Sequence, residues 1–321
     1  MTYFPPSTGG MLRIIFLMTF NQLRTFVEVA TAGSVIEAAR NLVVSPPAVS
    51  AAVGAIEREL SVELVERAGR GLVITPAGEV FARYARQVLA LLETAKAATA
   101  EALDPERGQL RLAAVTTAGE HVVPRFLASF RDRHPGSGIT LEVGNRDRVW
   151  DALERHDTDL AVGGRPPGGG RFVTLATRPN VLVLVAQGIG TPSVRDVDVE
   201  TVARSVVLLR EEGSGTRGTA EELLDEMGID PRTLTVGSNG AIRESVQVGL
   251  GITLISRDAV VRELEEGTLE EWRCAALPRH RAWHVVARAN EHLPATAGLF
   301  LTHLVSAGAD GFTLVPETSP G

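Results

Sequence analysis

Four loops in the second half of the chain carry groups that bind small anions. Each follows an apolar run of β type and is rich in glycine and hydroxyl side chains. The loops are Thr116–Gly119, Gly163–Arg165, Gly213–Gly218 and Gly237–Gly240. Their backbone N–H groups, their hydroxyls and the two arginines, Arg165 and Arg217, could converge on one anion. Because such loops often do no more than cap the next helix, we expect at least one of them, and not each of them, to contact a ligand.

One of these loops also has the glycine spacing of a dinucleotide site. Gly213, Gly215 and Gly218 follow a strand candidate and precede a helix candidate. A nicotinamide dinucleotide site also needs an acidic residue at the end of the next strand. Here Leu234–Val236 leads into Gly237 instead. The sequence therefore argues against a dinucleotide fold of this kind.

The catalytic and metal-binding patterns are incomplete. His280 and His284 are four residues apart, a spacing that binds metal on a helix, but His284 falls in an apparent strand. Ser214 lacks the Gly-x-Ser-x-Gly context of a nucleophile elbow. The only lysine, Lys96, stands outside any phosphate-binding loop motif. We therefore predict no enzyme, no cofactor and no metal site.

Alternating elements must position these loops. Strand candidates are Leu110–Val115, Ile139–Val143, Asp159–Val162, Phe172–Ala176, Val181–Val185, Val206–Leu209, Leu234–Val236, Ile252–Ile255 and Trp283–Ala287. Helix candidates are His121–Arg133, Arg146–His156, Ala220–Met227, Ala241–Val248 and Arg257–Glu265. This alternation predicts an α/β domain with a mainly parallel sheet, whose ligands lie beyond the carboxyl ends of the strands.

A second group of residues, near the N-terminus, has the spacing of a DNA-reading module. Three short helices are predicted around residues 23–30, 34–42 and 45–60. Ser34 caps the second, and Ser45 caps the third, with Pro46 and Pro47 at its first positions. Two helices joined by the tight turn at Val43–Val44 form a helix-turn-helix, whose second helix lies in the major groove.

A hairpin wing is predicted after the third helix. Leu64–Val65 and Leu72–Ile74 flank a tip that contains Arg67 and Arg70. The predicted DNA-contacting residues are Ser34, Ser45, Pro46, Pro47, Ser50, Ala51, Gly54, Arg67 and Arg70. Residues 19–78 contain five arginines and six acidic residues, so charge does not favour DNA, and a three-helix interaction domain remains the alternative.

A long helix is predicted next. Thr75 caps a helix that starts at Pro76, and about 30 residues at 1.5 Å each give a rod of about 45 Å. An apolar stripe repeats every three or four residues, as in a coiled coil: Phe81, Tyr84, Val88, Leu91 and Ala95. We interpret it as a dimerisation helix. The alternative is a helix that packs on its own C-terminal domain.

The overall composition excludes several classes. The 321 residues carry a net charge of −7, which excludes a uniformly basic nucleic-acid coat but not a local DNA-reading surface. The apolar run Ile14–Met18 is far too short to cross a bilayer. The single cysteine, Cys274, excludes an internal disulfide and fits a cytoplasmic protein. Residues 1–17 are expected to be a disordered tail or an over-long start, with Met18 as the true start.

The N-terminal string closely resembles the LysR-type transcriptional regulators. The resemblance rests on Leu23, Phe26, Gly33–Ser34, Ala38–Ala39, Leu42, Ser45–Ser50, Ile56–Glu57, Leu60, Leu64, Arg67 and Thr75–Gly78. The family usually has glutamine where this chain has Pro46, and often a basic or amide residue where it has Ala51. Because the Pro46 side chain cannot donate a hydrogen bond to a base, recognition of the operator sequence is expected to depend on apolar contacts with thymine methyl groups and on DNA shape.

The C-terminal half resembles the effector domain of the same family, a two-lobed fold like that of periplasmic binding proteins. The strings nearest to the branch that regulates Calvin-cycle carbon fixation genes are Ala114–Ala118, Pro124–Phe126, His134–Gly136, Asn145–Arg146, Gly163–Pro167 and Gly213–Arg217. That resemblance implies phosphorylated metabolites or NADPH as effectors. It places the effector pocket on Thr116, Thr117, Arg165, Ser214, Thr216, Arg217, Ser238 and Asn239.

The resemblance also implies the domain plan. The expected parts are a winged helix-turn-helix at 18–75 with its two-helix motif at 35–54, a linker helix at 76–107, lobe I at 108–178 and 281–306, lobe II at 179–280 and a loose tail at 307–321. The chain is expected to cross between the lobes near Thr177–Pro179 and Leu277–His280.

The partners implied are a double-stranded DNA operator, a small-molecule effector, and a second copy of the chain in a homodimer, with a tetramer built as a dimer of dimers. RNA polymerase is a further candidate. The alternative is a solute-binding protein or a small α/β enzyme that uses the same two lobes, which would leave the first 100 residues without a role.

Overall fold

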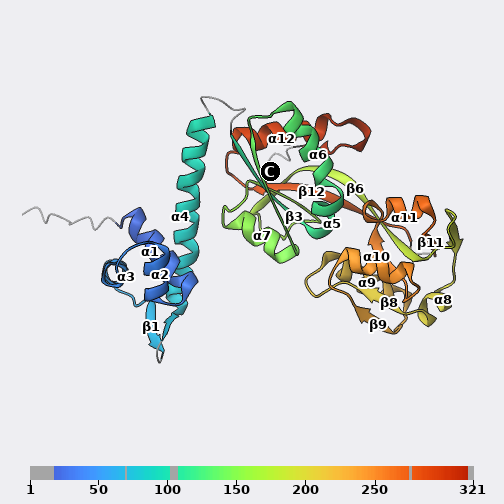
Figure 1. The fold of residues 1–321 in the computed structure, drawn as a ribbon, viewed down its shortest axis with the longest axis horizontal. Coiled ribbons are helices and arrows are strands. Elements are labelled where there is room, and N and C mark those ends of the chain that lie inside the picture. The colour runs from blue at the N-terminus through green and yellow to red at the C-terminus, as the bar shows by residue number, and fades with distance from the viewer. Residues whose placement is uncertain (1–17, 69–70, 102–107, 275–276, 317–321) are drawn as a thin grey trace, which may run out of the picture. The chain divides into compact units, whose positions relative to one another are not determined.

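The computed structural model describes residues 18–68, 71–101, 108–274 and 277–316. The chain divides into two compact units, with the boundary between Glu93 and Thr94. This boundary lies within the long helix α4, Pro76–Glu101 (Figure 1). The predicted N-terminal tail, residues 1–17, lies outside the described residues.

The first unit is a three-helix module with a two-stranded hairpin. Its elements are α1 Phe20–Ala32, α2 Val35–Asn41, α3 Pro46–Leu60, β1 Val65–Ala68, β2 Gly71–Ile74 and the first part of α4 Pro76–Glu101. The three short helices meet in one core, where Phe26, Val49 and Ile56 are fully buried. β1 and β2 pair antiparallel, as expected for a wing. The predicted helix-turn-helix at 35–54 is therefore confirmed as a structure.

Local sequence explains where these helices begin. The Ser34 hydroxyl accepts a hydrogen bond from the Glu37 backbone N–H, as predicted for an N-cap. Ser45 holds the N-cap position of α3 without a side-chain hydrogen bond, and Pro46 follows it at the first helical position. The turn between the two helices contains Val43 with φ of 56°, a left-handed conformation that strains a β-branched residue.

α4 begins against the core of the first unit. The Thr75 hydroxyl accepts from the Gly78 backbone N–H at 3.0 Å, which confirms the predicted cap. A Cβ on Gly78 would lie 2.1 Å from the Leu64 carbonyl oxygen, so only glycine allows this close approach. The Phe81 ring packs on Phe26 with their centroids 5.2 Å apart. Phe81, predicted to pair two chains, is thus half-buried in its own module.

The second unit contains a nine-stranded mixed sheet. Its first lobe contains β3 Gln109–Val115, β4 Gly138–Gly144, β5 Leu160–Gly163, α5 Thr116–His121, α6 Val123–Arg133, α7 Arg146–Glu154 and α12 Ala295–Ser306. Successive residues of a strand face opposite sides, and β3 shows this: Leu112 packs under α6 and α12, whereas Ala113 packs under α7. Helices therefore cover both faces (Figure 1).

The second lobe repeats this layering. Its elements are β7 Val194–Asp196, α8 Val199–Arg204, β8 Val207–Leu209, α9 Gly215–Met227, β9 Thr233–Thr235, α10 Asn239–Gln247, β10 Thr253–Ser256, the 3-10 turn η2 Arg257–Ala259, α11 Val261–Glu266 and β11 Leu269–Arg273. This lobe has two hydrophobic cores. Leu223 of α9 packs in one of them, and Ile242 and Val246 of α10 pack in the other.

Two long antiparallel strands join the lobes. β6 spans Phe172–Gln187 and β12 spans Arg279–Arg288, and they pair over almost the whole length of β12. Ala176 belongs to the core of the first lobe and Leu184 to a core of the second, so β6 passes through both (Figure 1). The crossing predicted near Thr177–Pro179 therefore lies inside one continuous strand rather than between two.

Two expectations are wrong. The sheet is mixed rather than mainly parallel, because β6 pairs antiparallel with β10, β11, β12 and the short strand β13 (Thr313–Leu314). The chain after residue 306 is not a loose tail throughout its described part. A turn at Gly308–Asp310 and strand β13 Thr313–Leu314 follow α12, and Phe312 is buried against Phe126. Burial of this aromatic side chain holds the segment on the first lobe.

Candidate functional site

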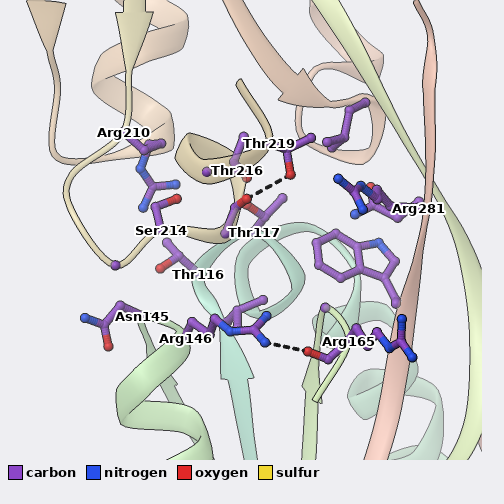
Figure 2. A pocket seen from close by; sticks show the side chains of 18 of the residues that line it. Thr116, Thr117, Asn145, Arg146, Arg165, Arg210, Ser214, Thr216, Thr219 and Arg281 are labelled. Atoms are coloured by element: carbon purple, nitrogen blue, oxygen red, sulfur yellow. Dashed lines mark hydrogen bonds between the residues drawn. The ribbon is translucent and has the colours of Figure 1, made fainter. Parts of the chain in front are cut away.

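A cavity of about 620 Å³ lies between the two lobes. Its walls come from the loops after β3, β4 and β5 in the first lobe, the loop after β8 in the second, and the middle of β6 and β12. These loops follow the carboxyl ends of parallel strands, where ligands of α/β sheets bind. Figure 2 shows polar side chains from both lobes around this space.

Five of the eight residues predicted for the effector pocket line the cavity. They are Thr116, Thr117, Arg165, Ser214 and Thr216. Among the lining residues that the prediction missed are Asn145, Arg146, Arg210, Arg281, Trp283 and His284. The pair Asn145–Arg146 lies one residue beyond a predicted strand, so the reasoning used for the other loops would have found it. The residues of β12 gave no such signal, because they lie inside a strand.

Arg217, predicted to bind the effector, lies outside the cavity lining. Helix residues turn by about 100° each, so Gly215, Gly218 and Glu222 share the face of α9 toward the cavity and Arg217 lies on the opposite face. Its Nε donates to Glu221 at 2.8 Å. Its Nη1 donates to the Arg210 carbonyl oxygen at 3.1 Å.

Ser238 and Asn239 also lie outside the lining. The Ser238 hydroxyl caps α10 by accepting from the Ala241 backbone N–H at 3.1 Å. Asn239 is 1% exposed and joins the two lobes behind the cavity. Its Nδ2 donates to the Thr117 hydroxyl at 3.0 Å, and its Oδ1 accepts from Arg210. Asn239 therefore holds two lining residues in place.

Two of the four cavity arginines are neutralised within the chain. Arg210 is 5% exposed and makes a two-point contact with Glu211, with both nitrogen–oxygen distances 2.7 Å. Burial alone would raise the pKa of Glu211, but the hydrogen bonds and charge of Arg210 outweigh it, so this pKa is below its ordinary value. Arg281 pairs with Glu222 at 2.8 Å.

The other two arginines, Arg146 and Arg165, have no carboxylate partner among the described residues. The Arg146 Nη2 donates to the Arg165 carbonyl oxygen at 2.7 Å, which brings the two residues together (Figure 2). Asp147, an exposed residue next to Arg146 in the sequence, also lines the cavity. Gly215 and Thr216, the first two residues of α9, line the same cavity. Unpaired guanidinium groups and a helix N-terminus form a favourable place for an anion.

The leading end of α3 is open to solvent. Ser45, Pro46, Pro47, Ser50 and Ala51 are exposed, while the opposite face of the helix is buried in the core of the module. Gly54 and Ser34 are partly exposed. Of the two predicted wing residues, Arg67 lies on β1 and Arg70 lies outside the described residues.

The predicted dimerisation stripe on α4 is also exposed. Tyr84 is 61% exposed, Val88 44% and Leu91 55%, and Ala95 is exposed too. Apolar side chains repeated every three or four residues and left open to water are typical of a helix that pairs with another helix.

Two family models together match most of the chain. "Bacterial regulatory helix-turn-helix protein, lysR family" matches residues 20–79, and "LysR substrate binding domain" matches residues 103–309. The chain belongs to the LysR family.

A similar relative of this LysR-type regulator is the RuBisCO operon transcriptional regulator of Acidithiobacillus ferrooxidans. It is 33% identical over 296 residues, which cover 91% of this chain and 95% of the relative. This confirms the expected resemblance to regulators of carbon fixation genes. The chain is therefore a DNA-binding transcriptional regulator that responds to a small molecule, and the solute-binding or enzymatic alternative is not favoured.

Solved structures show the same architecture. A cysteine variant of full-length OxyR from Pseudomonas aeruginosa matches with a TM-score of 0.69 and 22% identity, and the match covers 94% of this chain and 99% of OxyR. The regulatory domain of CcmR from Synechocystis PCC6803, solved in complex with 2-PG, matches with a TM-score of 0.56 and 28% identity over 62% of this chain and 96% of that domain. The predicted helix-turn-helix and two-lobed effector domain of this LysR-type regulator are thus confirmed. Within the described residues, no helix is both long and apolar enough to span a bilayer.

His284 is expected to give this LysR-type regulator a pH-dependent anion affinity. Burial and the nearby Arg165 charge lower the pKa of His284 below its ordinary value, so they favour the neutral form of the ring. A bound anion raises that pKa, so binding takes up a proton. We expect anion affinity to rise as the pH falls toward and below the ordinary pKa of histidine, and to level off once the pH is below the lowered pKa of the free protein. Calorimetry in buffers of different ionisation enthalpy, compared with His284→Gln, measures the uptake. Equal proton uptake in both proteins would exclude His284.

Proposed function

We propose that this regulator binds a small anionic metabolite in the cavity between its lobes and binds its operator with the leading end of α3. The observation that carries the effector proposal is the pair Arg146 and Arg165, which face the cavity without a carboxylate partner in the described chain. A phosphate or carboxylate group would neutralise the pair and accept hydrogen bonds from the start of α9.

The relatives support the same ligand class. The CcmR domain was solved with 2-PG, and another relative is named for the RuBisCO operon. Phosphorylated metabolites of carbon metabolism and NADPH are therefore the first effectors to test.

A thermal-shift screen tests the effector class. Phosphorylated sugars, nicotinamide nucleotides and aromatic acids are added separately to the full chain. A ligand present at a hundred times its dissociation constant stabilises its binding unit by about 2.7 kcal/mol, which is a clear shift in melting temperature. We expect the phosphorylated compounds to produce it. Stabilisation by uncharged analogues of the same compounds, with no preference for the anion, would contradict the proposal.

The DNA contact is proposed at the residues that α3 leaves open. Small side chains at Pro47, Ala51 and Gly54 allow the helix backbone to approach base edges, and the hydroxyls of Ser45 and Ser50 can bind phosphate. Ser34, Arg67 and Arg70 are proposed to contact the backbone beside the groove.

The assembly is proposed to be a homodimer formed through α4, and a tetramer built from two dimers, with RNA polymerase as a partner at the promoter. The exposed stripe Tyr84, Val88, Leu91 and Ala95 supports the dimer. The proposed domain boundaries are 18–75 for the winged helix-turn-helix and 76–107 for the linker helix. Lobe I comprises 108–178 and 281–306, and lobe II, at 179–280, is inserted in it. We also place the regulator in the cytoplasm, where its operator would be.

Leu91→Asp is expected to break the proposed dimer. A carboxylate in an apolar helix–helix seam must be desolvated without a partner, which costs several kcal/mol and would weaken association by about 100-fold or more. Sedimentation across a concentration series measures it. Arg83→Asp, at an exposed position off the stripe, is the matched control and should leave the assembly unchanged. An unchanged molecular mass for Leu91→Asp would contradict the assignment of this stripe.

A further inference from the structure

α3 carries a single cation, Arg58, on the face that points away from its core. Val49, Val53 and Ile56 are buried on one face of the helix. Pro47, Ala51, Gly54 and Arg58 follow one another at spacings of four, three and four, which puts them together on the opposite face. The first two turns of that face contain no side chain longer than proline.

Arg58 lies back along this face toward the start of the helix. A Cβ built on Gly54 would come within 3.3 Å of the Arg58 Nη1, so the guanidinium occupies space that the missing side chain leaves. Side chains of a helix lean toward its N-terminus, which agrees with this placement.

The Arg58 guanidinium is also available. The residue is exposed, and no carboxylate within the described part of the chain pairs with it. Three other polar side chains of the helix-turn-helix have partners within the chain. Arg40 pairs with Glu37 at 2.6 Å, and Asn41 donates to Glu28 at 2.7 Å. Glu57 accepts from the backbone N–H groups of Leu64 and Val65.

We propose that Arg58 reads a guanine in the operator, with Gly54 leaving the room that places its guanidinium against the major-groove edge. Arginine donates two parallel hydrogen bonds to guanine O6 and N7, and this contact is the commonest specific one in the major groove. A residue on the face opposite the core points toward the floor of the groove, whereas phosphates border its sides. This inference rests on the proposed binding of DNA by α3.

Selection from a random duplex library tests the proposal. The full chain is expected to select a sequence with a fixed guanine, and Arg58→Ala is expected to select the same sequence without that preference. On the wild-type consensus, Arg58→Ala should lose roughly 5- to 150-fold in affinity, with a much smaller loss on unrelated duplex. Replacing the guanine by 7-deazaguanine, which lacks the N7 acceptor, should weaken binding by the full chain and leave Arg58→Ala unaffected.

Two more variants separate geometry from charge. Arg58→Lys keeps the charge, so it should keep the salt dependence of binding while the guanine preference relaxes. Gly54→Ala should displace the guanidinium and relax the same preference, without loss of helix stability because alanine is the better helix former. Arg83→Ala on α4 removes one charge from the same unit and should leave the preference intact.

The possible results distinguish a failure of guanine recognition by Arg58 from a failure of the proposed DNA binding by α3. If Arg58→Ala weakened all duplexes equally and lowered the salt slope by about one, Arg58 would contact phosphate and the proposal would be overturned. An unchanged selected sequence in Arg58→Ala would also overturn it. A full chain that selects no sequence would contradict the proposed DNA binding itself.

Discussion

Ala51→Glu is expected to remove operator binding. Ala51 is exposed on the face of α3 opposite the buried core, and a carboxylate there would enter the negatively charged groove. Like charges brought together at an interface cost several kcal/mol, so the loss in affinity should be about 100-fold or more. Fluorescence anisotropy with a promoter duplex measures it.

The module should stay folded in this variant, because glutamate is a good helix former at an exposed site. Circular dichroism and the melting temperature check this. Ala295→Glu is the matched control, since it adds the same charge at an exposed position of α12 in the other unit. Operator binding by Ala51→Glu equal to that of the control would place the DNA contact somewhere other than α3.

Arg146→Ala and Arg165→Ala are each expected to weaken binding of the anionic effector by roughly 10- to 100-fold. Each change removes charge-assisted hydrogen bonds, which contribute about 1.5–3 kcal/mol. Neither arginine supports another side chain by an ion pair within the described residues, so the fold should be unaffected. Isothermal calorimetry measures the dissociation constant, and anisotropy should show unchanged operator affinity in the absence of effector.

Arg217→Ala is the matched control for these two variants. The sequence alone places Arg217 in the effector pocket, but in the structure its side chain binds Glu221 on the far side of α9. Its removal should leave effector affinity within about 2-fold of the original, because a partly exposed ion pair contributes little. Loss of effector affinity in Arg217→Ala with retention in Arg146→Ala would reverse the assignment.

The sequence predicted the local structure of the first unit well because its signals are local. Ser34, Ser45 and Pro46 mark helix starts through contacts within one helical turn, and the structure confirms each start. Val49, Val53 and Ile56 reveal the buried face through helical spacing alone. The spacing of Phe81 fits both a coiled-coil seam and contact with Phe26, and only the structure shows that its ring packs on Phe26.

The cavity could be predicted only in part because it is assembled from distant segments. Loops after strands can be found from sequence, which is how Thr116, Arg165 and Ser214 were identified. Whether a residue of α9 faces the cavity depends on the exact start of that helix, so Thr216 and Arg217 could not be separated. His284 and Trp283 reach the cavity because β6 and β12 cross between the lobes, and that pairing joins residues about a hundred positions apart.

The structure at the end of the chain also could not be predicted from the sequence, because it depends on contact with a distant segment. Glycine and small residues after α12 suggest a tail, yet Phe312 fills a place beside Phe126 in the core of the first lobe. Only a three-dimensional core supplies the burial that fixes such a short segment.

The most direct measurement is the binding of the full chain to a labelled duplex from the region upstream of its own gene, across a series of salt concentrations, with and without the anion found by thermal shift. We expect the affinity for DNA to fall steeply as the salt concentration rises. We also expect the affinity or the footprint to change when the anion fills the cavity, because the effector must favour one of two states of the protein. Salt-independent or absent binding at this region and at neighbouring promoters, or DNA binding that the anion leaves unchanged, would contradict it.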